Sequence, residues 1–187
     1  EMARDEISTG VMDEIFSGKY HFEERIMLSA DVYRKGRKIA QRTALNDVVI
    51  NKSALARMVD FEIHINNQYV SSFRADGLIV STPTGSTAHS LSAGGPILYP
   101  TLESFVMTPI CPHTLTNRPI VLPDKFIIEI RIKSGKNVYL TLDGQEGVPL
   151  KVDDTVKIKK ADFKTKFLLL NKRDYFKILR TKLKWGE

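Results

Sequence analysis

Short apolar runs with a two-residue period constrain the fold of this chain more than any other feature. Apolar and polar residues alternate in Phe61–Ile65, and in Lys125–Lys133 the apolar residues at 126, 128, 130 and 132 share one face. Alternation of this kind predicts strands with one buried face. Similar runs recur between residues 20 and 171, and no long helical pattern separates them. The sequence therefore predicts a mainly β fold with few helices and argues against a Rossmann or TIM-barrel architecture.

Turn residues divide this region into strands, because Arg34–Arg37 and Asn66–Asn67 suit hairpin turns, as do Ser134–Gly135 and Asp143–Gly144. Strands are expected at residues 25–32, 38–51, 61–65, 68–73, 77–81, 125–133, 138–142, 155–159 and 166–170. Helices are expected at residues 5–18, near 86–93 and at 174–184, where Gly18 and Gly94–Gly95 end the first two and Asp174 caps the third.

The net charge of +6 is unevenly distributed along the chain. Residues 1–124 carry a net charge of −2 and residues 125–187 carry +8. No aromatic platform interleaves the basic residues, so a nucleic-acid partner is not expected. A solvated basic face is the favoured interpretation, and an anionic small molecule or an acidic partner surface is the alternative.

Cysteine content and hydropathy exclude several classes of protein. The single Cys111 rules out an internal disulfide framework and a cysteine-rich zinc site, which favours a reducing, cytoplasmic setting. No run approaches the roughly 20 apolar residues that a membrane span needs. Glu1–Gly10 has no apolar region of the kind found in signal peptides.

Thr82–Gly95 (TPTGSTAHSLSAGG) is the segment most suggestive of chemistry. A strand leads into a loop and then into a helix N-terminus, whose free N–H groups attract anions. Gly85 would allow a ligand to approach the backbone, and seven hydroxyl side chains lie between Ser81 and Ser92. The segment suits a nucleotide but lacks the Gly-Lys-Ser/Thr ending of a Walker A loop. A structural connector is the alternative.

The residue order of this segment is distinctive. Residues 82–97 (TPTGSTAHSLSAGGPI) closely resemble the TPTGSTAYSLSAGGPI signature of bacterial NAD kinases. Other segments resemble the same family in the same order: ALNDVV (44–49), FRADGL (73–78), CPHTL (111–115), NRP (117–119), DGQ (143–145) and DYFKILRTKLKWG (174–186). The resemblance extends over nearly the whole chain.

The resemblance implies a β-sandwich-like C-terminal domain and the reaction ATP + NAD → ADP + NADP, with phosphoryl transfer to the adenosine ribose 2′-hydroxyl. The family's GGDG motif, whose Asp is taken as the catalytic base, does not occur in these 187 residues. We therefore expect a helical connection at 1–20, an NAD-binding β domain at 21–172 and a C-terminal helix at 173–187. No catalytic residue is assigned to this chain, which by itself should be inactive.

The resemblance also implies the dinucleotide contacts. Asn46 and Asp47 should hydrogen-bond the NAD ribose region, with Asp47 standing where the family usually has Glu. The adenosine-binding stretch corresponds to Thr87, Ala88, His89, Ser90, Leu91 and Ser92. His89 replaces the usual Tyr. Taken alone, Asn46–Asp47 would be a turn at a strand end, and His89 an ordinary surface or core histidine.

Four further positions match ligand contacts of the family: Arg57, Arg74, Asp76 and Gln145. Asp76 is expected near the nicotinamide half, from a neighbouring subunit, and Arg57 suits pyrophosphate. The alternatives are a surface ion pair between Arg74 and Asp76, a solvated Arg57 and a hairpin-turn role for Gln145.

The resemblance also sets the expected partners. These are NAD or NADP, ATP with Mg²⁺ or another divalent cation carried on its phosphates, and further copies of the chain in a dimer or tetramer. No membrane partner and no metal ligand set on the chain are expected. Two alternatives stay open: a nucleotide-binding or assembly module without catalysis, and a lipid-kinase-like phosphotransferase.

Overall fold

A computed structural model describes residues 9–54, 56–114, 116–170 and 174–184 of this chain. The chain divides into two compact units. One unit comprises Glu1–Glu24 with Lys166–Glu187, and the other comprises Arg25–Thr165. The second unit, hereafter the β body, contains nearly all of the strand pairing.

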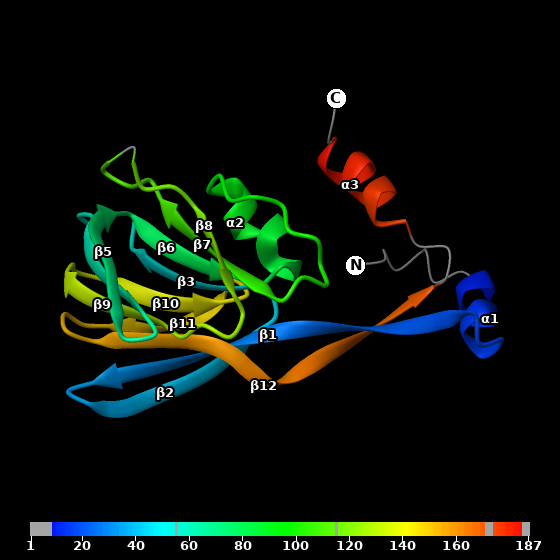
Figure 1. The fold of residues 1–187 in the computed structure, drawn as a ribbon, viewed down its shortest axis with the longest axis horizontal. Coiled ribbons are helices and arrows are strands. Elements are labelled where there is room, and N and C mark those ends of the chain that lie inside the picture. Colours follow the sequence, from blue (N-terminus) through cyan, green and yellow to red (C-terminus); the bar gives the residue numbers. More distant parts are fainter. Residues whose placement is uncertain (1–8, 55, 115, 171–173, 185–187) are drawn as a thin grey trace. The chain divides into compact units, whose positions relative to one another are not determined.

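Two six-stranded antiparallel sheets make up the architecture (Figure 1). The first sheet contains, in spatial order, β2 (Arg37–Ala44), β1 (Tyr20–Arg34), β12 (Thr155–Leu170), β9 (Ile128–Ser134), β4 (Val59–Ile65) and β5 (Gln68–Ala75). The second sheet contains β11 (Gln145–Leu150), β10 (Val138–Leu142), β3 (Asp47–Lys52), β6 (Gly77–Ser81), β7 (Ser104–Ile110) and β8 (Ile120–Pro123).

One apolar core lies between the two sheets of the β body. Alternate residues of β4 and β9, such as Ile63 and Ile130, are wholly buried and pack in one cluster with Ile50 of β3 and Leu140 of β10. The polar residues between them face away from the core, as the period of two requires. The predicted mainly β, sandwich-like fold is confirmed.

Several strands differ from the predicted ones. The single run expected at 38–51 is two strands, β2 and β3, which belong to different sheets and are separated at Leu45–Asn46. The runs expected at 155–159 and 166–170 are one continuous strand, β12, because the charged residues between them still alternate along the strand. Strands β7, β8 and β11 were not predicted. Pro109, Gly147 and Pro149 interrupt the β signal there, and Pro149 is tolerated because β11 is an edge strand.

The helix expected near 86–93 is split in two. A 3₁₀ helix, η2 (Thr84–Thr87), is followed by a single α-helical turn, α2 (His89–Ser92), and Ala88 between them has φ −96° and ψ −129°. Gly94 has φ +85°, so the glycine stop is confirmed. Strand Gly77–Ser81 and the turn at Asn66–Asn67, with φ values of 50° and 64°, are also as predicted.

The smaller unit contains the two terminal helices, α1 (Thr9–Phe16) and α3 (Tyr175–Leu183). Gly18 follows α1 with φ +73°. The Asp174 carboxylate accepts hydrogen bonds from the N–H groups of Phe176 and Lys177, which confirms its predicted capping role. Residues 5–8 of the first predicted helix lie outside the described part of the chain. Within the described residues, no helix combines the length and apolarity needed to cross a membrane.

Candidate functional site

Three segments distant in sequence meet at one end of the second sheet. Asp47, the first residue of β3, pairs with Ser81, the last residue of β6, and Val48 pairs with Leu142 at the end of β10. The chain therefore brings Asn46–Asp47, Thr82–Ser92 and Asp143–Gln145 together. We call this region the Asp47 end of the second sheet.

Asp143 fixes the bend between β2 and β3. Its carboxylate accepts hydrogen bonds from the backbone N–H groups of Leu45 at 2.8 Å, Asn46 at 2.8 Å and Asp47 at 3.0 Å. Its own N–H donates to the Asp47 carbonyl at 3.0 Å. An anion that receives three backbone N–H groups holds them more firmly than a neutral acceptor would. In the sequence, Asp143 belongs to a predicted hairpin turn and to the DGQ segment that resembles the family, and no local signal links it to residues 45–47.

Thr82 and Gly85 attach the loop after β6 to the same bend. The Thr82 N–H donates to the Asn46 carbonyl at 2.9 Å, and the Thr82 hydroxyl donates to the Leu45 carbonyl at 2.6 Å. A Cβ at Gly85 would lie 2.1 Å from the Asn46 carbonyl oxygen. The expectation that Gly85 leaves room for a ligand therefore needs correction, because the backbone of Asn46 occupies that space.

The hydroxyl groups of this segment divide into two sets. Ser86 donates to the Pro83 carbonyl at 2.7 Å and accepts from the Leu98 N–H at 3.0 Å, and the Ser90 and Thr108 hydroxyls lie 3.0 Å apart. These buried hydroxyls hold the loop in shape. Thr87 and Ser92 are exposed. Among the predicted contact residues, Ser90 thus directs its hydroxyl into the protein, while Thr87 and Ser92 have theirs at the surface.

An imidazole and a buried carboxylate are paired at this end of the sheet. His89 Nδ1 lies 3.1 Å from Asp47 Oδ2 and 3.2 Å from Oδ1. The Asp47 side chain is wholly buried, whereas 58% of the His89 side chain is exposed. Burial raises the pKa of Asp47 above its ordinary value; His89 opposes this effect, and the nearby Asp143 charge adds to it.

Asn46, Ala88 and Leu91 are half-buried at the Asp47 end, and Gln145 is exposed where β11 leaves the Asp143–Gly144 turn. Together with Asp47, Thr87, His89, Ser90 and Ser92, they account for nine of the twelve predicted contact residues. No local pattern predicts this grouping, because Leu45 and Asp143 are 98 positions apart in the chain.

The remaining three predicted residues lie elsewhere. Gly77 pairs with Asn51, so Asp76 is at the opposite end of β6 from Ser81. Five strand positions separate the two ends, which is about 17 Å. Arg74 lies on β5 of the first sheet, and Arg57 is exposed in the connection between β3 and β4.

Arg74 and Asp76 each have a partner, but they are not partners of one another. The Arg74 guanidinium donates to both Asp60 carboxylate oxygens, at 2.6 and 3.1 Å, and together with Ser134 it lowers the pKa of Asp60. Asp76 Oδ1 lies 3.5 Å from Lys52 Nζ. The alternative of a direct Arg74–Asp76 ion pair is therefore wrong.

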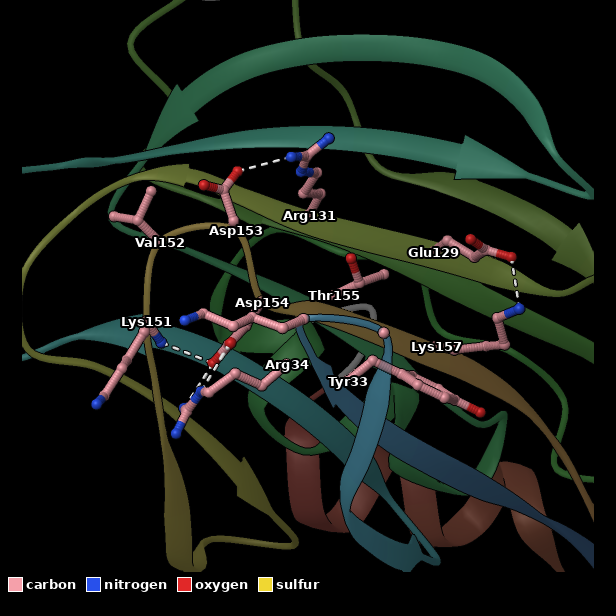
Figure 2. A pocket seen from close by; sticks show the side chains of 12 residues that line it. Tyr33, Arg34, Glu129, Arg131, Lys151, Val152, Asp153, Asp154, Thr155 and Lys157 are labelled. Atoms are coloured by element: carbon pink, nitrogen blue, oxygen red, sulfur yellow. Dashed lines mark hydrogen bonds and ion pairs between the residues drawn. The ribbon is translucent and has the colours of Figure 1, made fainter.

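A separate pocket of about 620 Å³ lies on the first sheet of the β body (Figure 2). Figure 2 shows three ion pairs among its charged side chains: Arg34 with Asp154, Arg131 with Asp153 and Lys157 with Glu129. None of the predicted contact residues lines this pocket. Over the described residues, no group of three or more His, Cys, Asp and Glu side chains could hold a metal ion.

Comparison with known proteins is informative for the whole chain. Residues 45–170 match the family model described as the ATP-NAD kinase C-terminal domain. The chain is 51% identical to the NAD kinase of Geotalea daltonii over 177 residues, which cover 94% of this chain and 62% of that protein. It is 50% identical to the NAD kinase of Geobacter sulfurreducens, covering 100% of this chain and 66% of that protein. The chain thus spans a little under two thirds of the length of these relatives.

Solved structures with the same fold include two kinases in complex with nucleotides. Yeast NADH kinase complexed with NADH matches with a TM-score of 0.89 and 29% identity, covering 95% of this chain and 53% of that one. An NAD kinase from Archaeoglobus fulgidus in complex with ATP matches with a TM-score of 0.75 and 27% identity, covering 94% and 64%. Because the family model matches well over half of its residues, this chain belongs to the ATP-NAD kinase family and carries its C-terminal domain.

Proposed function

We propose that the protein containing this chain is an NAD kinase, which transfers the terminal phosphoryl group of ATP to the adenosine ribose 2′-hydroxyl of NAD. The observation that carries the proposal is the convergence of Asn46–Asp47, Thr82–Ser92 and Asp143–Gln145 in a chain of this family. The similar yeast and archaeal kinases, bound to NADH and ATP respectively, support the choice of nucleotides.

The chain's part in this reaction is to bind and orient the dinucleotide. In phosphoryl transfer, catalysis is largely positioning and charge stabilisation. Asn46 offers an amide with both a donor and an acceptor for ribose hydroxyls. Thr87, Ser92 and Gln145 present exposed polar groups around Ala88, whose small side chain leaves room for the adenine ring. The divalent cation is carried by the ATP phosphates, and the setting is the cytoplasm.

A second copy of the chain completes the dinucleotide site in this proposal. Within one chain, Asp76 and Asp47 lie at opposite ends of the paired strands β3 and β6. A dinucleotide held at the Asp47 end of one subunit therefore meets Asp76 and Arg74 from a neighbouring subunit. A symmetric dimer or tetramer provides this arrangement, because one interface serves both subunits.

The smaller unit supports a contact with the rest of the full-length protein. Phe16 of α1, Phe22 of β1 and Phe176 of α3 are 80%, 59% and 50% exposed. Aromatic side chains of this size are costly to leave in water. We assign these helices to packing against the part of the full-length kinase that lies outside this chain.

The test is NADP formation by the full-length protein with ATP and Mg²⁺. Changing Asn46→Ala should lower kcat/KM by roughly 10- to 100-fold, since one well-ordered hydrogen bond is lost. The matched control is Gln41→Ala, an exposed amide on the edge strand β2, which should change kcat/KM by less than about twofold.

The same assay distinguishes the alternatives. Binding of NAD without any NADP formation by the full-length protein would instead support a non-catalytic module. Phosphorylation of a lipid and not of NAD would support a lipid-kinase relative. If Asn46→Ala lowers kcat/KM no more than the Gln41→Ala control does, Asn46 is only a turn residue.

A further inference from the structure

We infer that Asp47 is a positioning residue that holds the His89 imidazole by Nδ1, so that Nε2 accepts a hydrogen bond from a ribose hydroxyl of the bound dinucleotide. The inference rests on the proposed function and deepens it. It starts from the contact between the buried Asp47 carboxylate and the His89 ring.

The first observation is that the two side chains depend on each other. Asp47 is wholly buried, and among the described residues His89 is the only side chain within hydrogen-bonding distance of its carboxylate. A buried carboxylate needs a partner, because water is not available to solvate it. The His89 ring supplies that partner from the first residue of α2.

The second observation concerns which edge of the ring remains open. Nδ1 faces Asp47, and a Cβ built on Gly144 would lie 3.6 Å from Cε1, so the β10–β11 turn lies beside that carbon. The ring is nevertheless 58% exposed. Nε2 and Cδ2 form the edge of the ring opposite Nδ1, and the hydrogen bonds of the described residues give Nε2 no partner.

The chemistry of Nε2 follows from the contact at Nδ1. When Nδ1 carries the proton that is donated to Asp47, Nε2 of the neutral ring has a lone pair and acts as an acceptor. A ribose hydroxyl is a suitable donor. A ring held in this way by a carboxylate has a fixed tautomer and orientation before the ligand arrives.

The charges around the ring are negative. The Asp47 carboxylate on β3 lies against the ring, and the charge of Asp143 in the β10–β11 turn acts on Asp47. Among the described residues, no Lys or Arg forms an ion pair with either carboxylate. A nucleotide phosphate would be repelled by these carboxylates, whereas a hydroxyl would not. This charge pattern favours a ribose hydroxyl over a phosphate as the group that meets Nε2.

His89→Asn separates the two roles of the ring. Asparagine can still donate to Asp47 from a side-chain amide, in place of Nδ1, but it has no atom at the position of Nε2. In the full-length kinase we expect KM for NAD to rise roughly 3- to 10-fold, which is the loss of one neutral hydrogen bond. We expect kcat and the thermal midpoint to stay near their wild-type values.

Two controls accompany this variant. His64→Gln changes a half-buried histidine on β4 of the first sheet, and Asp153→Asn changes an exposed carboxylate in the pocket of Figure 2. Neither should alter KM for NAD. ¹⁵N NMR of histidine-labelled full-length protein should find the His89 ring in the Nδ1–H form, with an Nε2 resonance that moves when NAD is added.

The outcomes are separable. An unchanged KM in His89→Asn, or a ring in the Nε2–H form, overturns the inference while NADP formation continues. Loss of folding in His89→Asn leaves the NMR measurement on the wild-type protein to decide, and a static Nε2 resonance on NAD addition is then the contrary result. A full-length protein that makes no NADP contradicts the proposed function, whatever the tautomer of His89.

Discussion

At the scale of single residues, the candidate site contains two carboxylates with opposite effects on stability: the partly buried Asp143 and the fully buried Asp47. Asp143 stabilises its surroundings, because three backbone N–H groups donate to it. Asp47 is held where its charge is unfavourable, since burial raises its pKa. A residue kept at a cost to stability is a candidate for function rather than for folding.

Changing Asp143→Asn should destabilise the β body by about 2 kcal/mol. Asparagine tolerates the positive φ of 50° at this position, but its amide places N–H groups where one carboxylate oxygen accepts a backbone N–H. Urea unfolding of the full-length protein measures the loss. The control Asp162→Asn lies on an exposed part of β12 and should change the unfolding free energy by less than about 0.5 kcal/mol.

Asp47→Asn should change stability in a pH-dependent manner. A carboxylic acid whose pKa is raised on folding contributes stability at low pH, and this contribution is lost as the pH rises through the folded-state pKa. The variant should therefore unfold at a higher temperature than the wild type at pH 8, and the difference should shrink as the pH falls toward 5. Equal differences at both pH values would contradict the raised pKa.

At the scale of elements, the site depends on close packing between the β2–β3 bend and the loop after β6. Gly85 lies against the backbone of Asn46, and Thr82 hydrogen-bonds to two carbonyls of the bend. Ala88, with φ −96° and ψ −129°, then separates η2 from α2. Close packing and hydrogen bonding therefore explain most of the small and hydroxylated residues in Thr82–Gly95.

Gly85→Ala should destabilise the β body by more than about 2 kcal/mol, because its Cβ would overlap the Asn46 carbonyl, which is itself held by the Thr82 N–H. Gly94→Ala is the matched control. Gly94 has φ +85° with open space around it, so alanine there should cost only about 1 kcal/mol of backbone strain. Equal losses in thermal unfolding would mean that Gly85 is present for conformation and not for close approach.

At the scale of the whole molecule, the proposed shared site can be tested by mixing two impaired variants. Asn46→Ala impairs the Asp47 end and Asp76→Ala impairs the opposite end of β6. If one site uses both ends from different subunits, a mixed dimer contains one site with both native residues. When equal amounts of the two variants are refolded together, about half of the dimers are mixed and each has one intact site of two. NADP formation should then recover to about a quarter of the wild-type level. Activity no higher than that of the separate variants would place both residues in one subunit's site.

Local sequence determined a large part of this molecule. Strands such as Gly77–Ser81 and Val138–Leu142, the turn at Asn66–Asn67 and the Asp174 cap were predictable, because period, positive φ and capping are decided within a few residues. The Thr82–Gly95 segment was chosen as the candidate site because its residue order resembles the family's signature, whereas its local pattern alone also suited a structural connector. Strands β7 and β11 were not predicted. They form because pairing with neighbouring strands overrides the local cost of Pro and Gly.

Only the tertiary structure decided how these parts are used. The bend at Leu45–Asn46 exists because Asp143, 98 residues away from Leu45, accepts the N–H groups that would otherwise continue a strand. Arg74 pairs with Asp60, which lies directly opposite it on the neighbouring strand β4, and not with Asp76, which follows the end of β5. Asp47 and His89 are 42 positions apart in the sequence, and nothing local relates them. The register of β3 against β6 places them in contact, since hydrogen bonds between distant strands, and not local propensity, fix which side chains meet.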